Sequence, residues 1–339
     1  MTETDQIGQV RVLYDIRGRR STFEELEIGK DLGSAEFLLT QEHVDQECEK
    51  FRFHHPYYEV DSPFGGTVAP ISLTYLLPRN LFSRAYSVRG LFYKWEFETL
   101  EPVKPDVKYI VSARLADKWI RNDREFVAYT AECRDGAGNL IYTTRRAHVM
   151  DFIKRTAPKV GEGGISSSAE NSAEAIAVRS LSLNPDWDVP TAAGSGTFEV
   201  TPVADQRTTL GAALPPNSSY WSQREFERIE RKSNATTLHF DVNAANQEGL
   251  PAPVATGPYV MELIHRSAMQ FFGAGWIRGG RADLTVVRPT FPGEYVMSSG
   301  TVTGIEREKN GALRITCQAT VKNQKGEVKI AGKVSGLVS

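Results

Sequence analysis

The sequence predicts an α+β protein made of two similar halves, each a curved antiparallel sheet wrapped around one central helix. Three observations support this prediction: short sequence features that recur in both halves, one strongly apolar helical segment in each half, and segments of alternating polar and apolar residues after that helix. The recurring features are a Val-Ala pair, a P-x-x-P sequence and a glycine turn. Val68 and Val254 are 186 residues apart, Pro105 and Pro292 are 187 apart, and Gly138 and Gly326 are 188 apart. Such a near-constant offset indicates an internal duplication.

The helical segments follow the Val-Ala pair in each half. They lie within residues 62–82, SPFGGTVAPISLTYLLPRNLF, and residues 250–273, LPAPVATGPYVMELIHRSAMQFFG. In the second segment, apolar residues occupy most of the helix circumference: Val260, Met261, Leu263, Ile264, Ala268, Met269, Phe271 and Phe272. A helix that is apolar all round is expected to be buried, so we expect one buried central helix in each half.

Alternating segments follow each helix. Residues 100–120 and 126–142 in the first half, and 287–306 and 313–330 in the second, alternate polar and apolar side chains and are rich in β-formers. The turn sequences DGAGN and KNQKGE separate or follow them, which predicts consecutive antiparallel strands. Each sheet needs a partner for its apolar face, and the sister half can supply it.

A segment rich in Gly, Ser, Ala and Pro divides the chain. Residues 154–197 contain few large apolar side chains and cannot bury enough surface to order themselves, so we expect a linker there. The expected domains are therefore a first half at 1–153 and a second half at 198–339.

Composition excludes several classes of partner. The 40 Lys and Arg nearly balance the 42 Asp and Glu, so no basic field favours nucleic acid or an anionic membrane. Three cysteines occur in no metal-ligand spacing, which suits reduced thiols. No apolar run approaches the roughly 20 residues of a membrane span, and the polar start MTETDQIGQV lacks a signal-peptide pattern. The expected location is the cytoplasm.

Three stretches carry a resemblance to a known family. HFDVNAANQEGLPAPVATGP (239–258) resembles the segment of MaoC-like acyl dehydratases and R-specific enoyl-CoA hydratases in which a catalytic His precedes the central helix. WIRGGRADLTVVRPTFPGEYV (276–296) is similar to their following strand, and HHPYYEVDSPFGGTVAP (54–70) to the degenerate first repeat of double hot-dog members. The resemblance implies a double hot-dog fold with a substrate-lining first half and a catalytic second half.

The catalytic motif departs from the family pattern Asp-x-Asn-x-x-His. With the family His on His239, which we place near the end of a strand, Asn234 occupies the position of the Asp. A rival alignment places Asp241 and Asn243 as the acid and amide, with Asn246 where the His belongs. The first alignment is favoured because it keeps the His and its distance to the glycine of the helix start.

The resemblance implies a role for each candidate residue. His239 acts as general base and acid, Asn234 orients the water or the imidazole, and the N–H groups at the helix start near Gly257 stabilise the thioester oxygen. The same reasoning places four further side chains on the substrate: Thr256, Asp241, Val254 and His55. Structural roles are the alternative, with Gly257 a packing glycine where helix crosses sheet and His239 a satisfied structural residue beside a strand.

Other charged and polar residues receive no role from the sequence. His54 and His55 stand at the place of His239 in the first half, but no Asp or Asn precedes them at motif spacing, so a lining role is favoured over a second site. Arg278, Arg281 and Arg288 are candidates for the phosphates of coenzyme A, but arginines on strands are ordinary, so none is assigned.

The expected activity is reversible hydration of a 2-enoyl-CoA, or of an acyl carrier protein thioester, to a 3-hydroxyacyl thioester of R configuration. The resemblance implies neither a metal nor another cofactor, and it leaves a homodimer open. Two alternatives remain: a hot-dog thioesterase, which needs a carboxylate to activate water, and a non-catalytic acyl-thioester-binding protein that has lost its acid.

Overall fold

The computed structural model describes residues 21–86, 88, 91–150, 204–230, 237–247 and 249–338. The expected linker, residues 154–197, lies outside the described residues, as do both predicted domain boundaries and Asn234.

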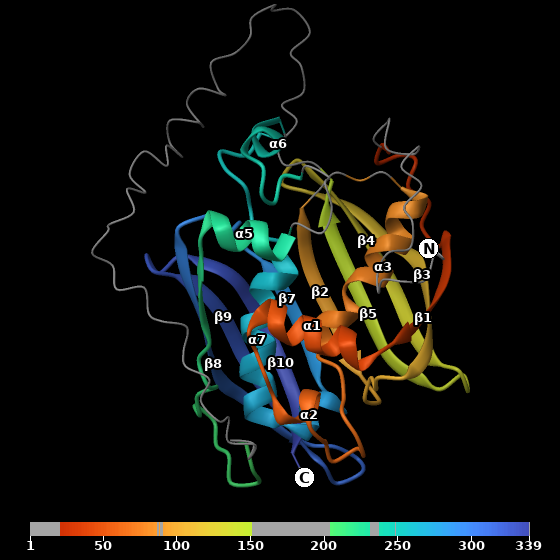
Figure 1. The fold of residues 1–339 in the computed structure, drawn as a ribbon, viewed down its shortest axis with the longest axis vertical. Helices are drawn as coiled ribbons and strands as arrows, with labels where there is room; N and C mark the ends of the chain where they lie inside the picture. The colour runs from red at the N-terminus through yellow and green to blue at the C-terminus, as the bar shows by residue number, and fades with distance from the viewer. Residues whose placement is uncertain are drawn as a thin grey trace, which may run out of the picture.

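One ten-stranded antiparallel sheet forms the body of the molecule (Figure 1). Its strands are β1 (Asp31–Leu39), β2 (Phe92–Thr99), β3 (Val107–Arg121), β4 (Arg124–Asp135), β5 (Leu140–Val149), β6 (Ser218–Trp221), β7 (Arg281–Val286), β8 (Glu294–Arg307), β9 (Leu313–Asn323) and β10 (Val328–Val338). Their order across the sheet is β1-β3-β4-β5-β2-β7-β10-β9-β8-β6. Read outward from the centre, the two halves have the same strand order, as the sequence repeat predicts.

The halves meet where β2 pairs with β7. The register runs from Lys94 opposite Thr285 to Glu98 opposite Arg281. Lys94 Nζ lies 2.9 Å from Asp283 Oδ1, and an Arg281 guanidinium nitrogen lies 2.8 Å from Glu98 Oε1, so ion pairs cross the junction on the outer face. The duplicated units therefore share one continuous hydrogen-bonded sheet.

Period-2 alternation explains how the strands bury one face. In β3, Tyr109, Val111, Ala113 and Leu115 are buried, whereas the residues between them are exposed. This is the pattern of a strand with one face on a core. The strands predicted at 100–120, 126–142, 287–306 and 313–330 correspond to β3, β4, β8 and β9, with ends that differ by several residues.

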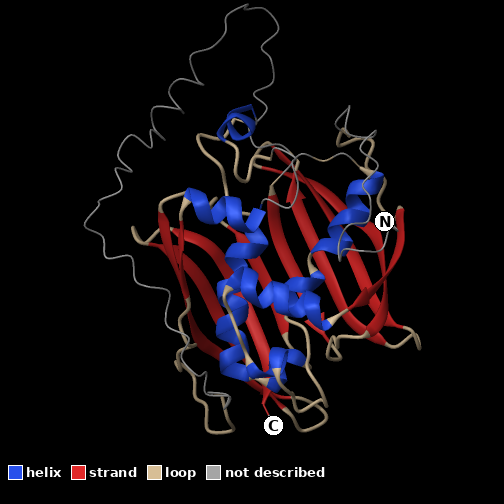
Figure 2. Cartoon of the chain, in the orientation of Figure 1, coloured by secondary structure: helices blue, strands red, loops and turns tan. Residues whose placement is uncertain are grey.

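The helices lie on one face of the sheet (Figure 2). They are α1 (Gln41–Phe51), α2 (Pro56–Glu59), the 3-10 helix η2 (Ile71–Thr74), α3 (Leu76–Ala85), α5 (Gln223–Glu230), α6 (Val242–Gln247), α7 (Gly257–Phe272) and α8 (Ala274–Ile277). Helix α7 is almost entirely buried and packs against β2, β8, β9 and β10, as predicted for the central helix of the second half. No described helix is both long and apolar enough to cross a bilayer.

The first half differs from the prediction of one long central helix. The segment is broken into η2 and α3. Pro78 has no N–H to donate to the carbonyl of Thr74, four residues earlier, so a continuous α-helix cannot form its full set of hydrogen bonds there. The equivalent residue of the second half, 186 positions on, is Ile264, and α7 continues through it.

A buried arginine compensates for this break. Arg146, on β5 and fully buried, donates to the Thr74 carbonyl at 2.8 Å and to the Tyr75 carbonyl. Its guanidinium also lies over the rings of Tyr75 and Trp95, at 5.0 and 4.9 Å from their centroids. The first-half helix is thus held by a side chain from the sheet, which fixes the position of Tyr75 and the start of α3.

Candidate active site

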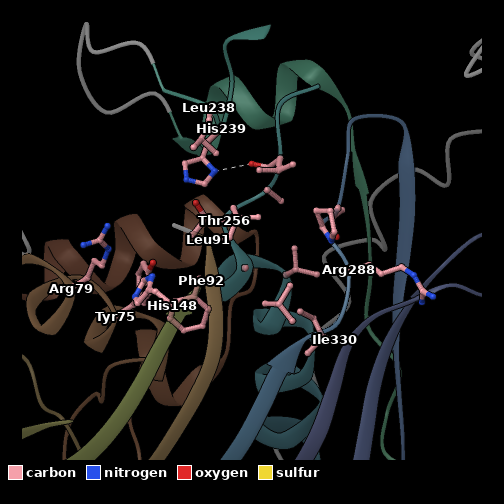
Figure 3. A pocket seen from close by; sticks show the side chains of 17 residues that line it. Tyr75, Arg79, Leu91, Phe92, His148, Leu238, His239, Thr256, Arg288 and Ile330 are labelled. Atoms are coloured by element: carbon pink, nitrogen blue, oxygen red, sulfur yellow. Dashed lines mark hydrogen bonds between the residues drawn. The ribbon is translucent and has the colours of Figure 1, made fainter. Parts of the chain in front are cut away.

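A cavity lies between the halves at the start of α7 (Figure 3). Its empty space is about 620 Å³, a volume that includes the open solvent at its mouth. Residues of both halves line it: the first half contributes α3 and the ends of β2 and β5, and the second half contributes the turn at His239, the α7 start and the segment after β7.

The α7 start presents one free backbone donor to the cavity. Thr256 is the N-cap, Gly257 the first helical residue and Pro258 the second. Pro258 carries no N–H, and the Tyr259 N–H bonds to the Thr256 carbonyl at 2.9 Å. Within the described chain, the Gly257 N–H has no acceptor. Because helix N-termini favour negative charge, this N–H is suited to an oxygen that develops negative charge.

Gly257 also lies against the other wall of the cavity. A Cβ atom built on it would lie 2.8 Å from Val286 Cγ2 and 3.4 Å from Phe92 Cδ1. Real Cβ contacts are not as short as 2.8 Å, so only glycine fits unless the Val286 side chain shifts. This contact supports the packing interpretation of Gly257, and its catalytic role stays a prediction.

His239 lies in the turn 238–240, and it lines the same cavity as the α7 start. This differs from the strand end expected from the sequence. Its Nδ1 lies 2.8 Å from the Val254 carbonyl oxygen. A carbonyl only accepts, so Nδ1 carries the proton in the neutral ring and Nε2 holds a free lone pair. Nε2 has no partner among the described residues, and the ring lines the cavity, so Nε2 is available as a base.

Of the remaining candidate residues in this segment, some line the cavity and others lie at or on α6. Thr256 and Val254 line the cavity. Asp241 is not among the residues that line it: its carboxylate accepts the Ala244 N–H at 2.7 Å and caps the start of α6, and its contact with the substrate stays a prediction. Asn243 and Asn246, the other residues of the rival alignment, are exposed on α6.

Comparison with solved structures decides the fold. A MaoC-like dehydratase aligns with 94% of this chain and 99% of its own, at a TM-score of 0.67 and 16% identity. A MaoC domain protein dehydratase from Chloroflexus aurantiacus aligns over 94% and 97%, at 0.65 and 10% identity. A Mycobacterium tuberculosis protein described as having a double hot-dog fold aligns over 94% and 98%, at 0.56 and 11% identity. The fold is a double hot-dog. No family model and no curated protein sequence matches the chain.

His55 has a different place in the double hot-dog from the one expected. It is buried outside the cavity, where it is the N-cap of α2, and its Nδ1 accepts the Tyr57 N–H at 3.1 Å. Burial lowers the pKa of His55 to about 4. A neutral ring that accepts a backbone N–H serves as a helix cap, and the substrate contact expected of His55 stays a prediction.

The low pKa of His55 predicts acid-sensitive stability. Above pH 6.5 the ring is neutral in both states and its contribution to folding is fully present. As the pH falls from 6.5 to about 4, the unfolded ring takes up a proton that the folded ring refuses, so stability drops. His55→Asn keeps a capping oxygen and cannot titrate, so we expect its free energy of unfolding to fall by about 2 kcal/mol less than wild type between pH 7 and pH 4. Urea titrations at both pH values measure this, and equal losses would contradict it.

The first half contributes cavity residues that the sequence did not single out: Tyr75, Arg79, Phe92 and His148. His148 is buried near the end of β5, and its ring packs against Phe82, Phe92 and Tyr129. Burial, together with the positive charges of Arg79 and Arg146, holds the pKa of His148 well below its ordinary value. No motif spacing marks these residues, because they reach the cavity through the sheet that joins the halves.

The three arginines considered as ligands of the coenzyme A phosphates differ in their surroundings. Arg278 and Arg281 pair with Glu101 and Glu98, respectively. Arg288 contributes to the cavity wall, but in Figure 3 its side chain extends away, and its charge acts on Glu327. Among the described residues, no group of three or more His, Cys, Asp or Glu could hold a metal ion.

Proposed function

We propose that this chain is a MaoC-like hydratase or dehydratase that reversibly adds water to a 2-enoyl-CoA, giving a 3-hydroxyacyl-CoA. One observation carries the proposal: an imidazole with an unprotonated Nε2 and the free N–H of Gly257 line the same cavity. The fold shared with MaoC-like dehydratases supports it. The R configuration of the product follows the family resemblance.

The proposed reaction uses these two groups in turn. His239 Nε2 takes a proton from a water molecule, and the water oxygen adds to C3 of the enoyl group. The electron pair moves through C2 to the thioester oxygen, where the Gly257 N–H and the α7 dipole stabilise the enolate. The imidazolium then returns the proton to C2. The sum is one water added across the double bond, with no net change in the enzyme.

The Val254 carbonyl has a positioning role in this scheme. By accepting from Nδ1 at 2.8 Å, it keeps the proton off Nε2 in the neutral ring and steadies the imidazolium when Nε2 is protonated. The family motif uses an acidic residue beside the His. Asn234 stands in its place here and can orient a water or the ring, but it cannot accept a proton as a carboxylate does.

Hydration is favoured over the two alternatives. A hot-dog thioesterase needs a carboxylate to activate water, and no Asp or Glu is among the described residues that line the cavity. A pure binding protein would not need an imidazole with a free Nε2 and an unpaired amide in one cavity. The cavity chemistry therefore supports a water addition driven by His239.

The proposal is tested by incubating the purified protein with crotonyl-CoA and with larger and branched 2-enoyl-CoAs. We expect the thioenoyl absorbance to fall without release of free thiol, and the product to be the 3-hydroxyacyl-CoA. Thiol release would indicate the thioesterase. Absence of turnover across the whole panel would reject the hydratase.

A further inference from the structure

The charged side chains among the described residues that line the cavity are cationic. This described lining contains two arginines and two histidines, and neither Asp nor Glu. The head group of Arg288 points away, as described above, which leaves Arg79 as the arginine at the first-half end of the cavity. Figure 3 shows Arg79 on the same side as Tyr75 and His148, apart from His239.

Arg79 has no carboxylate partner in the described part of the chain. It donates to Ser83 Oγ on its own helix, and its guanidinium lies 5.8 Å from the centroid of the buried Phe82 ring. Arg146 adds a second, fully buried positive charge nearby, and its partners in the described chain are carbonyls, the Thr144 and Tyr129 hydroxyls and aromatic rings. Positive charge in low dielectric is costly without a negative partner, so this end of the cavity favours an anion.

His148 offers a matching polar atom. Its Nε2 lies 3.3 Å from the Tyr129 hydroxyl. Its Nδ1 has no hydrogen-bond partner among the described residues. When the Tyr129 hydroxyl donates to Nε2, Nδ1 carries the proton of the neutral ring and is a donor. Desolvation and the adjacent arginines keep this ring neutral, so it contributes a donor without adding another charge.

We propose that Arg79 and His148 bind a carboxylate carried by the acyl group, so that the preferred substrate is the CoA thioester of a dicarboxylic acid. This rests on the proposed function for the thioester end of the ligand. The hydratase groups lie at the α7 start in the second half, whereas the cationic group belongs to α3 and β5 in the first. One ligand spanning both would present its thioester to His239 and its free carboxylate to Arg79.

The phosphates of coenzyme A are the other source of negative charge. Arg79 is half-buried beside Phe82 and acts electrostatically on His148 and Tyr129, which are buried. A multiply charged phosphate keeps its hydration more readily at a surface than beside such apolar rings. A single carboxylate, which accepts a guanidinium and an N–H donor, fits this end of the cavity better.

Binding of saturated acyl-CoAs tests the inference without turnover. Calorimetry would compare succinyl-, glutaryl- and adipyl-CoA with uncharged isosteres in which an isopropyl group replaces the carboxylate, such as 5-methylhexanoyl-CoA for glutaryl-CoA. For at least one chain length we expect wild type to bind the acid about tenfold more tightly. Equal affinities at every length would overturn the proposal.

Variants assign the preference to the residues. Arg79→Met should abolish the preference for the acid while leaving the affinity for the uncharged isostere and for free CoA nearly unchanged, and Arg79→Lys should retain part of it. Arg288→Met, which removes a guanidinium that points away, should keep the preference. Equal weakening of acid, isostere and free CoA by Arg79→Met would assign Arg79 to the phosphates and overturn the proposal. Thermal melts check that each variant is folded.

Turnover then separates the two proposals. If wild type prefers the dicarboxylic ligand but hydrates no 2-enoyl-CoA, including the unsaturated form of the preferred ligand, the anion site stands and the hydratase is rejected. If it hydrates neutral enoyl-CoAs as efficiently as carboxylated ones, the hydratase stands and the anion site is rejected.

Discussion

Replacing His239 by alanine should lower kcat/KM for enoyl-CoA hydration by about 10²- to 10⁴-fold, the range expected for loss of a general acid–base group. The reason is that Nε2 is the acceptor positioned by the Val254 carbonyl beside the cavity, and the described residues that line this cavity include no carboxylate to replace it. Loss of thioenoyl absorbance under subsaturating substrate measures the effect. Affinity for a saturated acyl-CoA should change little.

His54→Ala is the matched control, because His54 is a partly exposed histidine outside the cavity. It should retain wild-type turnover. If His239→Ala also keeps full turnover, His239 is not the base, and another group of the protein supplies the proton transfer. If neither wild type nor the variant turns over substrate while both bind acyl-CoA tightly, the chain is a binding protein.

Gly257→Ala should damage both stability and activity. The added Cβ would stand 2.8 Å from Val286 Cγ2, so the Val286 side chain, the α7 start or β7 must shift, at a cost of about 1 to 3 kcal/mol of unfolding free energy. Because the Gly257 N–H moves with the helix start, we expect hydration to fall on the order of 100-fold, as misplacement of about 1 Å can produce. Urea unfolding and steady-state kinetics measure the two effects.

A second substitution shows whether crowding is the cause. Val286→Ala removes the methyl groups that the new Cβ meets, so the double variant should recover much of the stability lost by Gly257→Ala. Gly136→Ala is a control for glycine replacement itself, since a Cβ there meets nothing within 4 Å. Additive losses in the double variant would mean that Gly257 is required for a reason other than its contact with Val286.

Much of the fold could be predicted because it depends on local pattern and repetition. Alternation along β3 and β8 predicts strands with one buried face, and apolar residues around α7 predict a buried helix. The offset of 186 to 188 residues predicts two equivalent units, and the sheet order has the same symmetry. The expectation failed for the first-half helix, where Pro78 removes one donor and Arg146 from a distant strand takes its place.

The candidate site was less predictable. Motif spacing found His239, Val254, Thr256 and Gly257, which lie within 19 residues of one another and all line the cavity. The same spacing does not separate a substrate contact from a helix cap, since the Asp241 carboxylate caps the start of α6. His55 caps α2 in a similar way, from a position that the repeat makes equivalent to that of His239.

The sequence by itself determined the repeat, the alternation of the strands, the buried helix of the second half and the short segment that holds His239 and Gly257. Only the tertiary structure decided which residues of the first half face that segment, and so placed Arg79 and His148 in the same cavity. The physical reason is that pairing of β2 with β7 joins residues almost two hundred positions apart, and no local pattern encodes which side chains such a junction brings together.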